Sequence, residues 1–168
     1  MEIKDFTLNE ENSWKAFETD IDIWGEKVSI LIDIDDMPVN EDSLKFFLPE
    51  INRKIQFIES HKNEIYKAML DDGMLECAED WASSGEEDED EEECYIMEDG
   101  QKVYLPISEE DFFKSLHLDG ININLSKNDD IKSFADMFFH CDPDYFAYHS
   151  IEVFVDEDDN IKCNGLAG

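Results

Sequence analysis

The strongest constraint on the fold is a strict alternation of apolar and polar side chains over residues 28–34. Val28, Ile30, Ile32 and Ile34 are separated by Ser29, Leu31 and Asp33. Because successive side chains of a strand point to opposite faces, this period of two predicts a strand with one buried face, and Leu31 indicates that the other face is partly covered. Gly25 stands between this run and an apolar run over 14–23, so we predict a hairpin over 14–34.

A second pattern supplies an element that can cover the buried face. Apolar residues recur every three or four positions at Leu44, Phe47, Leu48, Ile51, Ile55, Ile58, Ile65 and Met69. This spacing is typical of an amphipathic helix. Pro49 lies inside the stripe, and a proline in the first turn of a helix loses no hydrogen bond. We therefore predict a short helical turn over 42–47, a main helix that starts at Pro49 and ends before Gly73, and a shorter helix over 74–81.

Turn and capping signals organise the chain after residue 94. An Asp-Gly pair stands between two apolar runs and predicts a hairpin over 95–105. Ser108 precedes three acids, which suit the positive N-terminus of a helix. We therefore predict a capped helix from Ser108 to about His117, closed by Gly120.

The remaining pattern is again that of strands. Alternation predicts a strand over 121–125 and a C-terminal hairpin over 151–163. Residues 131–139 suit a helix and a strand equally. Together these elements predict a single α+β domain over 1–168, in which antiparallel strands and hairpins are covered by a central amphipathic helix.

Charge is the second constraint. The formal net charge is -32, from 13 Lys and Arg against 45 Asp and Glu. Residues 86–93 are eight consecutive acids. Neighbouring carboxylates repel one another and favour hydration, so we expect an acidic, mobile loop over 84–94 without a packed element. The helical stretch 41–67 is neutral, whereas 68–94 carries 13 acids and no Lys or Arg.

This charge makes several classes of ligand unexpected. Nucleic-acid binding depends on Lys and Arg that displace counterions from phosphates, so we expect no direct binding of nucleic acid. Anionic membrane surfaces are disfavoured on the same ground. No apolar run approaches the roughly 18 residues of a spanning helix, and the start of the chain has no pattern of a signal peptide. The cysteines have no paired spacing, which is typical of a reduced, cytoplasmic protein: Cys77, Cys94, Cys141 and Cys163.

No motif predicts a cofactor, a metal site or a catalytic group. His140, Cys141 and His149 lie close in the sequence but match no zinc spacing. A stretch that starts at Asp20 begins like a calcium loop, yet Leu31 stands where a bidentate acid is required. Neither a nucleophile elbow nor a phosphate-binding glycine loop occurs. We therefore expect a protein that is not an enzyme and needs no cofactor.

The last part of the chain combines a segment rich in Asp, Tyr and Phe over 142–153, which contains His149, with residues 159–161 and the closing 165–168. It resembles a group of bacterial domains of unknown function. Members of that group are small, free-standing, acidic α+β proteins, and some similar families resemble immunity proteins, which protect a cell against a neighbour's toxin. The resemblance implies no catalytic role for His149.

Two functions are compatible with these patterns. The first is an interaction protein, such as an immunity protein, that binds and blocks a basic partner such as a toxin, because opposite charge speeds association. The second is a cytoplasmic domain whose acidity serves solubility, and a DNA-mimic inhibitor is a further variant. For the first function the candidate partner-binding residues are Asp71, Asp72, Glu76, Glu79, Asp80, Glu86, Glu87, Asp88, Glu89, Asp90, Glu91, Glu92 and Glu93.

Overall fold

A computed structural model of the chain describes residues 1–11, 14–97, 100–127 and 130–168. The strands of its large sheet are β1 (Thr7–Glu11), β2 (Trp14–Ile23), β3 (Glu26–Ile34), β7 (Leu116–Lys127), β8 (Ile131–Cys141), β9 (Ser150–Val155) and β10 (Ile161–Ala167). A small sheet contains β4 (Glu86–Glu87), β5 (Cys94–Ile96) and β6 (Lys102–Tyr104). The helices are a 3-10 turn η1 (Ile3–Asp5), α1 (Glu41–Ser60), α2 (Lys62–Asp71), α3 (Met74–Ser83) and α4 (Glu109–Ser115).

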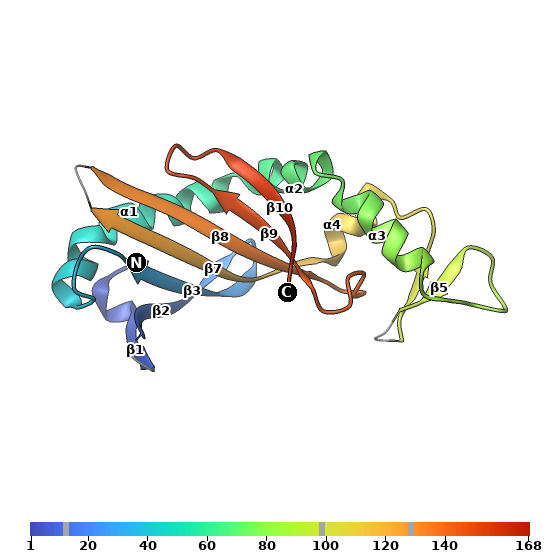
Figure 1. Cartoon of the computed structure of the whole chain (residues 1–168), viewed down its shortest axis with the longest axis horizontal. Helices are drawn as coiled ribbons and strands as arrows, with labels where there is room; N and C mark the ends of the chain where they lie inside the picture. The colour runs from blue at the N-terminus through green and yellow to red at the C-terminus, as the bar shows by residue number, and fades with distance from the viewer. Residues whose placement is uncertain (12–13, 98–99, 128–129) are drawn as a thin grey trace.

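The elements form a helical layer on one face of the large sheet. Figure 1 shows α1 and α2 running along that face, with α3 and the small sheet at one end of the molecule. The order of the large sheet is β1-β2-β3-β7-β8-β9-β10. Its neighbouring strands are antiparallel except β3 and β7, which pair in parallel with Ile30 opposite Ile121. The predicted α+β fold is confirmed, with a mixed sheet in place of a purely antiparallel one.

The core lies between the sheet and the helices. The four alternating residues of β3, from Val28 to Ile34, are buried in one hydrophobic cluster with the apolar stripe of α1 and α2, of which Leu48 alone lies outside the cluster. The predicted hairpin is confirmed: β2 and β3 pair, and Trp24 and Gly25 connect them with φ of 55° and 87°. Two successive residues with positive φ match the twist of the flanking strands, which explains the glycine.

The helix prediction is wrong at Pro49. Helix α1 is continuous from Glu41, and Pro49 lies inside it. An interior proline costs about 3 kcal/mol because it removes a backbone hydrogen bond. Burial of Phe47 before it and Ile51 after it keeps one helix in place, and Asn40 caps the earlier start by accepting the N–H of Ser43 at 3.1 Å.

The break between the long helices falls at His61, which closes α1 and precedes α2. Helix α2 ends before Gly73, as predicted, and Gly73 adopts a left-handed φ of 79°. Helix α3 then covers the predicted short helix over 74–81 and runs two residues further, to Ser83.

In the second half of the chain, the predicted helix after Ser108 needs correction, and the structure decides whether residues 131–139 form a helix or a strand. The helix after Ser108 ends at Ser115, slightly before the predicted end near His117, and Gly120 does not close it, because Leu116 and Leu118 already alternate toward the core as part of β7. Gly120 instead follows a bulge, where the register with β8 shifts. The ambiguous stretch 131–139 is the strand β8, whose buried residues alternate. The hairpins β5–β6 and β9–β10 are confirmed, although residues 98–99 of the first turn and 128–129 of the β7–β8 turn lie outside the described residues.

One fully buried charge joins α1 to the C-terminal hairpin. The side chain of Lys54 has 0% exposure, and its Nζ donates to the carbonyl of Asp156 at 2.8 Å and to Oδ1 of Asp159 at 2.7 Å. Arg53 Nη1 donates to Oδ2 of Asp159 at 2.5 Å. Burial favours a higher pKa for Asp159, but the hydrogen bonds from Arg53 and Lys54 outweigh it and lower the pKa. The turn between β9 and β10 is therefore held by a charged network.

We predict that Asp159→Asn lowers the free energy of unfolding by about 2 kcal/mol at pH 7, because it leaves Lys54 buried without its counterion. Asparagine tolerates the left-handed φ of 64° at this position, so the change isolates the charge. Urea unfolding measures the difference. The matched control is Asp158→Asn in the same turn, where the exposed side chain predicts a change below about 0.5 kcal/mol.

The ion pair between Lys54 and Asp159 also predicts how the free energy of unfolding depends on pH. A carboxyl group whose pKa is lowered by folding stabilises the native state above its unfolded pKa, about 3.9, and loses that contribution as the pH falls through the folded pKa. The gap in unfolding free energy between the wild type and Asp159→Asn should therefore narrow as the pH falls from 7 through 4 toward 3. A gap that stays constant would show that the Asp159 charge is not its source.

Candidate partner-binding surface

Most of the predicted acidic residues belong to α3, β4 and the loop 88–93, at the end of the molecule that carries the small sheet (Figure 1). Asp71 and Asp72 mark the end of α2, and Glu76, Glu79 and Asp80 belong to α3. The remaining eight acids form β4 and the loop 88–93 that follows it.

Gly85 makes the direct connection from α3 to β4 possible. A Cβ atom at this position would lie 3.0 Å from the carbonyl oxygen of Ile96 and 3.1 Å from that of Ala82. Such contacts are tighter than a side chain normally permits, so the close approach of α3 to β5 requires glycine here. The acids of α3 and of β4 are thereby held on neighbouring elements.

The acidic run is partly folded, contrary to the expectation of a loop without a packed element. Glu86 and Glu87 form β4 and pair with Ile96 and Tyr95 of β5. The cause is the hydrophobic hairpin beside them, whose edge offers the backbone of β4 a ladder of hydrogen bonds while both acidic side chains stay exposed. The mobility of the loop stays a prediction.

A single lysine from β6 organises the rest of the run. Lys102 Nζ lies 2.5 Å from Asp88 Oδ2 and 2.9 Å from Glu91 Oε1. The Tyr104 hydroxyl also donates to Glu91. These hydrogen bonds lower the pKa of Asp88, through Lys102, and that of Glu91, through Tyr104 and then Lys102. The hydrogen bond to Glu91 raises the pKa of Tyr104 to about 12.

The other predicted acids remain open to a partner to different degrees. Within the described residues, salt bridges reach only Asp71, Asp88 and Glu91 of the thirteen. Glu79 is engaged otherwise, since its Oε1 accepts the backbone N–H of Ile107 at 2.8 Å and ties α3 to the segment before α4. We assign Glu79 to the fold and the remaining exposed acids to the candidate surface.

Exposed aromatic side chains lie at the same end. Trp81 on α3 is 36% exposed, Tyr104 on β6 is 53% exposed, and Tyr148 in the loop 142–149 is 79% exposed. Trp and Tyr are enriched at protein interfaces and among the residues that dominate binding energy. Sequence reasoning missed all three, because the exposure of an aromatic residue depends on how distant elements pack and leaves no periodic signal.

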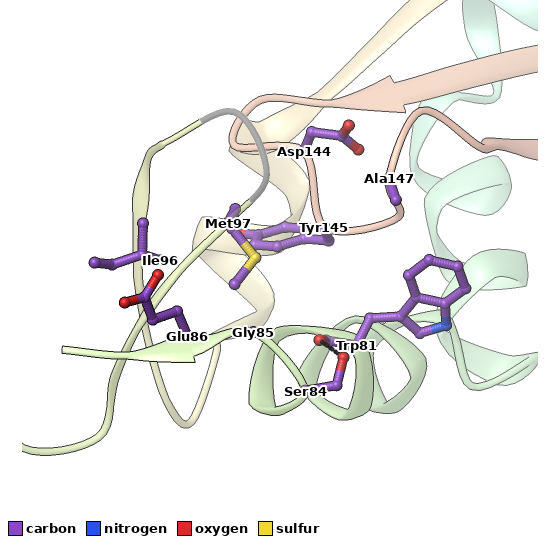
Figure 2. Close-up of a pocket in the computed structure, with 9 residues that line it drawn as sticks. All are labelled: Trp81, Ser84, Gly85, Glu86, Ile96, Met97, Asp144, Tyr145 and Ala147. Carbon is purple, nitrogen blue, oxygen red and sulfur yellow. Dashed lines mark hydrogen bonds between the residues drawn. The ribbon is translucent and has the colours of Figure 1, made fainter.

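A pocket of about 540 Å³ lies where α3, the β4–β5 pair and the loop 142–149 meet. Figure 2 shows the rings of Trp81 and Tyr145 and the thioether of Met97 around it, with carboxylates of Glu86 and Asp144 on two sides. Ser84, Gly85, Ile96 and Ala147 complete the lining.

The loop that forms one wall of the pocket is shaped by Asp144. Its Oδ1 accepts the N–H of Phe146 at 3.1 Å, and its Oδ2 accepts the N–H of Tyr148 at 2.8 Å. Ala147 and Tyr148 have left-handed φ of 49° and 69°. These hydrogen bonds compensate two unfavourable backbone conformations and turn Tyr148 outward.

The histidine and cysteine residues of the 140–149 region have separate surroundings. His140 stacks on His117 at 5.1 Å between ring centroids, and its Nδ1 lies 2.8 Å from Asp119 Oδ1. Burial raises the pKa of Cys141 to about 12, so its nucleophilic thiolate is scarce at neutral pH. His149 packs against Trp81 instead. Across the described ranges, no cluster of three or more His, Cys, Asp and Glu is arranged to hold a metal ion.

These features define an α+β protein with a mixed seven-stranded sheet, one helical layer, and exposed acidic and aromatic side chains on α3 and the small sheet. A family model described as an uncharacterized protein conserved in bacteria, DUF2262, matches residues 2–166. The chain belongs to this family. The match extends over nearly the whole chain and confirms the resemblance seen in the C-terminal segment. Comparison with curated proteins and with solved structures gave no match. Of the helices that the structure describes, none combines the length and apolar character needed to cross a bilayer.

We predict that Lys102→Gln releases the loop 88–93. Without the ammonium group, Asp88 and Glu91 repel each other and their neighbours, so the amide of Asp88, which donates to the Cys94 carbonyl at 2.9 Å, should exchange hydrogen faster. Hydrogen exchange followed by NMR measures this rate. Lys114→Gln is the charge-matched control, since Lys114 pairs with Glu110 on α4. Equal exchange rates in both variants would contradict an organising role for Lys102.

Proposed function

We propose that this protein is a cytoplasmic, non-enzymatic binding protein that associates with a basic protein through an acidic-aromatic surface. We define this surface by the exposed acids of α3, β4 and the loop 88–93, together with Trp81, Tyr104 and Tyr148. An immunity protein that blocks a cationic toxin is the concrete form of the proposal. The observation that carries it is the location of exposed aromatic residues and uncompensated carboxylates at the same end of the molecule.

Electrostatics supports a basic partner. Most carboxylates of the acidic-aromatic surface have no Lys or Arg of the described residues within salt-bridge distance, whereas on α1 Glu50 is neutralised by Arg53 at 2.7 Å. The stretch 68–94 thus carries 13 acids and no Lys or Arg of its own, which gives this part of the molecule a strong negative field. Such a field attracts cationic proteins over a range of about 8–10 Å at physiological salt and raises association rates.

The aromatic residues favour binding over solubility alone. Acidity that serves solubility needs no exposed Trp or Tyr, and each of these side chains loses favourable burial when it stays in water. At an interface they supply large contact areas with few rotatable bonds, while the surrounding acids form the polar rim. Trp81, Tyr104 and Tyr148 therefore fit the contact points of an interface.

Two chemical observations support a non-enzymatic role. Burial raises the pKa of the Cys141 thiol to about 12 and that of the Cys163 thiol to about 11, which makes both poor nucleophiles at neutral pH. Burial also raises the pKa of the Asp136 carboxyl, but Asp136 lies on β8 beside Asn124 and does not line the pocket at α3. All four cysteines are free, which agrees with a reducing compartment.

Charge-matched variants test the proposal. One variant carries Glu87→Gln, Glu89→Gln, Asp90→Asn and Glu92→Gln on the acidic-aromatic surface. The control carries Asp22→Asn, Glu59→Gln, Glu64→Gln and Asp158→Asn, four exposed acids elsewhere that form no salt bridge within the described ranges. Both variants raise the net charge by the same amount, so they separate local from overall electrostatics.

The binding partner for this test is a basic protein encoded beside the gene, with association measured by surface plasmon resonance at low and physiological salt. The first variant should associate about tenfold more slowly at low salt, with a weaker salt dependence, and the control should change less than about threefold. Equal slowing in both variants would show that the overall charge, and not the acidic-aromatic surface, sets the association rate. Absence of binding to every basic neighbour would contradict the toxin-blocking form.

A further inference from the structure

We propose that the face of the large sheet opposite α1 and α2 is a docking surface for a basic amphipathic helix of a partner protein. This surface, which we call the open face, is centred on Asp136 of β8 and includes four apolar residues: Leu31, Phe134, Phe138 and Phe154. It shares no residue with the acidic-aromatic surface. The inference therefore goes beyond the proposed function and is tested separately from it.

Alternation along the strands places these residues away from the helices. In β8, Phe134, Asp136 and Phe138 alternate with three residues that are buried in the core. Leu31 alternates with core residues of β3, and Phe154 with core residues of β9. Because successive side chains of a strand point to opposite faces, all five lie on the face of the sheet that is opposite α1 and α2.

Strand pairing brings the five residues into one patch. Asp136 lies opposite Asn122 of β7 on one side and opposite Phe154 of β9 on the other. Asn122 in turn lies opposite Leu31 of β3. Phe134 precedes Asp136 by two residues along β8, and its ring packs against that of Phe154 at 5.6 Å between centroids. The acid at the centre is thus surrounded by apolar side chains.

The patch has the dimensions of a helix footprint. From Phe134 to Phe138 it extends about 13 Å along β8, because a strand rises about 3.3 Å per residue. From Leu31 to Phe154 it crosses the neighbouring strands β3, β7, β8 and β9, which is about 14 Å at the usual spacing between strands. A helix with its side chains is about 10–12 Å wide and rises about 5.4 Å per turn, so about three turns cover the patch.

The four apolar residues keep surface that the fold does not bury. Each is half-buried, and in the part of the chain that the structure describes none of them belongs to the hydrophobic core or to the half-buried residues packed against it. Apolar surface gains free energy when it leaves water. A helix docked on the open face would supply that burial as a third layer, in the way that α1 and α2 supply it to the other face.

The carboxylate at the centre of the open face is partly desolvated. Burial, and then the charge of Glu152, raises the pKa of Asp136, whereas the hydrogen bond from Asn124 Nδ2 at 3.2 Å lowers it. Lys132, the lysine of β8, pairs with Glu157 at 2.8 Å instead. Among the described residues, no salt bridge reaches Asp136 or Glu152. A cation from a partner would therefore be their counterion at a place from which water is partly excluded.

Further acids surround this centre. Glu18 of β2 lies opposite Leu31, and Asp33 follows Leu31 by two residues along β3. Lys162 of β10 lies opposite Phe154, at the edge of the face. Acids outnumber lysines around the apolar residues, so the charge of the open face complements a basic partner.

The same charges disfavour a second copy of the chain as the occupant. In a symmetric dimer the same patch of each copy meets the other, so the Asp136 and Glu152 carboxylates would face their own counterparts. A net charge of -32 on each copy adds to this repulsion. A basic amphipathic helix instead offers apolar side chains every three or four residues to the patch, and Lys or Arg beside them to the carboxylates.

The test is an NMR titration of the isotope-labelled full chain with the peptide Ac-KLLKLLKKLLKLLK-NH2, which forms a basic amphipathic helix of about four turns. We expect the largest amide shifts in β8 and β9, with a dissociation constant in the micromolar range. The analogue with Glu in place of every Lys keeps the apolar face and should bind at least about tenfold more weakly. Equal affinity for the two peptides, or shifts confined to the loop 88–93, would overturn the proposal.

Matched variants separate the patch from general attraction. We expect Asp136→Asn to weaken binding of the basic peptide about fivefold, and Asp158→Asn, an exposed acid of the β9–β10 turn, to weaken it less than about twofold. Phe154→Thr keeps a residue suited to a strand and should weaken binding about tenfold, whereas Phe46→Ala on α1 should not. The dispersion of the spectrum of each free variant shows that it folds. Equal weakening within either pair of variants would overturn the proposal.

Two further outcomes identify the occupant and keep the two proposals apart. A dimer of the free protein in analytical ultracentrifugation that Phe154→Thr dissociates would assign the open face to a second copy and overturn the proposal. The loop variant with four neutralised acids at 87, 89, 90 and 92 should bind the peptide within about twofold of the wild type. If it loses binding altogether, the peptide occupies the acidic-aromatic surface, and the open face is not the docking site.

Discussion

The parallel pairing of β3 with β7 is the contact on which the rest of the structure depends. It joins two antiparallel groups, β1–β3 and β7–β10, into one sheet. Parallel neighbours cannot be connected by a tight turn, so the chain after Ile34 must leave the sheet and return before Leu116. Between these two residues the chain forms α1 and α2, which cover the apolar face of the sheet, and then α3, the small sheet and α4 at one end of the molecule. The acidic-aromatic surface, except for Tyr148, is thus part of the crossover between the two central strands.

Charged residues have two different roles in this structure. On α1, Lys54 is fully buried and paired with Asp159, which fixes the C-terminal hairpin against the helix. At the far end one lysine, Lys102, meets two acids of the run, and most of the others keep facing water. The first arrangement stabilises the fold. The second leaves a concentrated negative field beside exposed rings, a combination suited to capturing a cationic surface.

Local patterns predicted most of the secondary structure, and their failures have specific causes. The predicted break before Pro49 and the predicted closure of a helix by Gly120 followed from local preference. Burial of Phe47 and Ile51 instead keeps α1 continuous through Pro49, and the alternation from Leu116 makes Gly120 part of a strand. The site was less predictable. Acids were found from the sequence, but the contacts of Lys102 with the run, the exposure of Tyr148 and the pocket beside Trp81 arise from residues distant in the chain.

The sequence by itself determined the α+β class, the hairpins, the amphipathic helical stripe and the concentration of acids over 68–94, because periodicity and charge are properties of neighbouring residues. The tertiary structure decided the parallel join of β3 and β7, the pairing of β4 with β5, the engagement of Glu79 with Ile107 and the aromatic pocket. The physical reason is that most of these contacts join segments far apart in the chain. Their formation depends on the burial of the whole sheet, which no local pattern encodes.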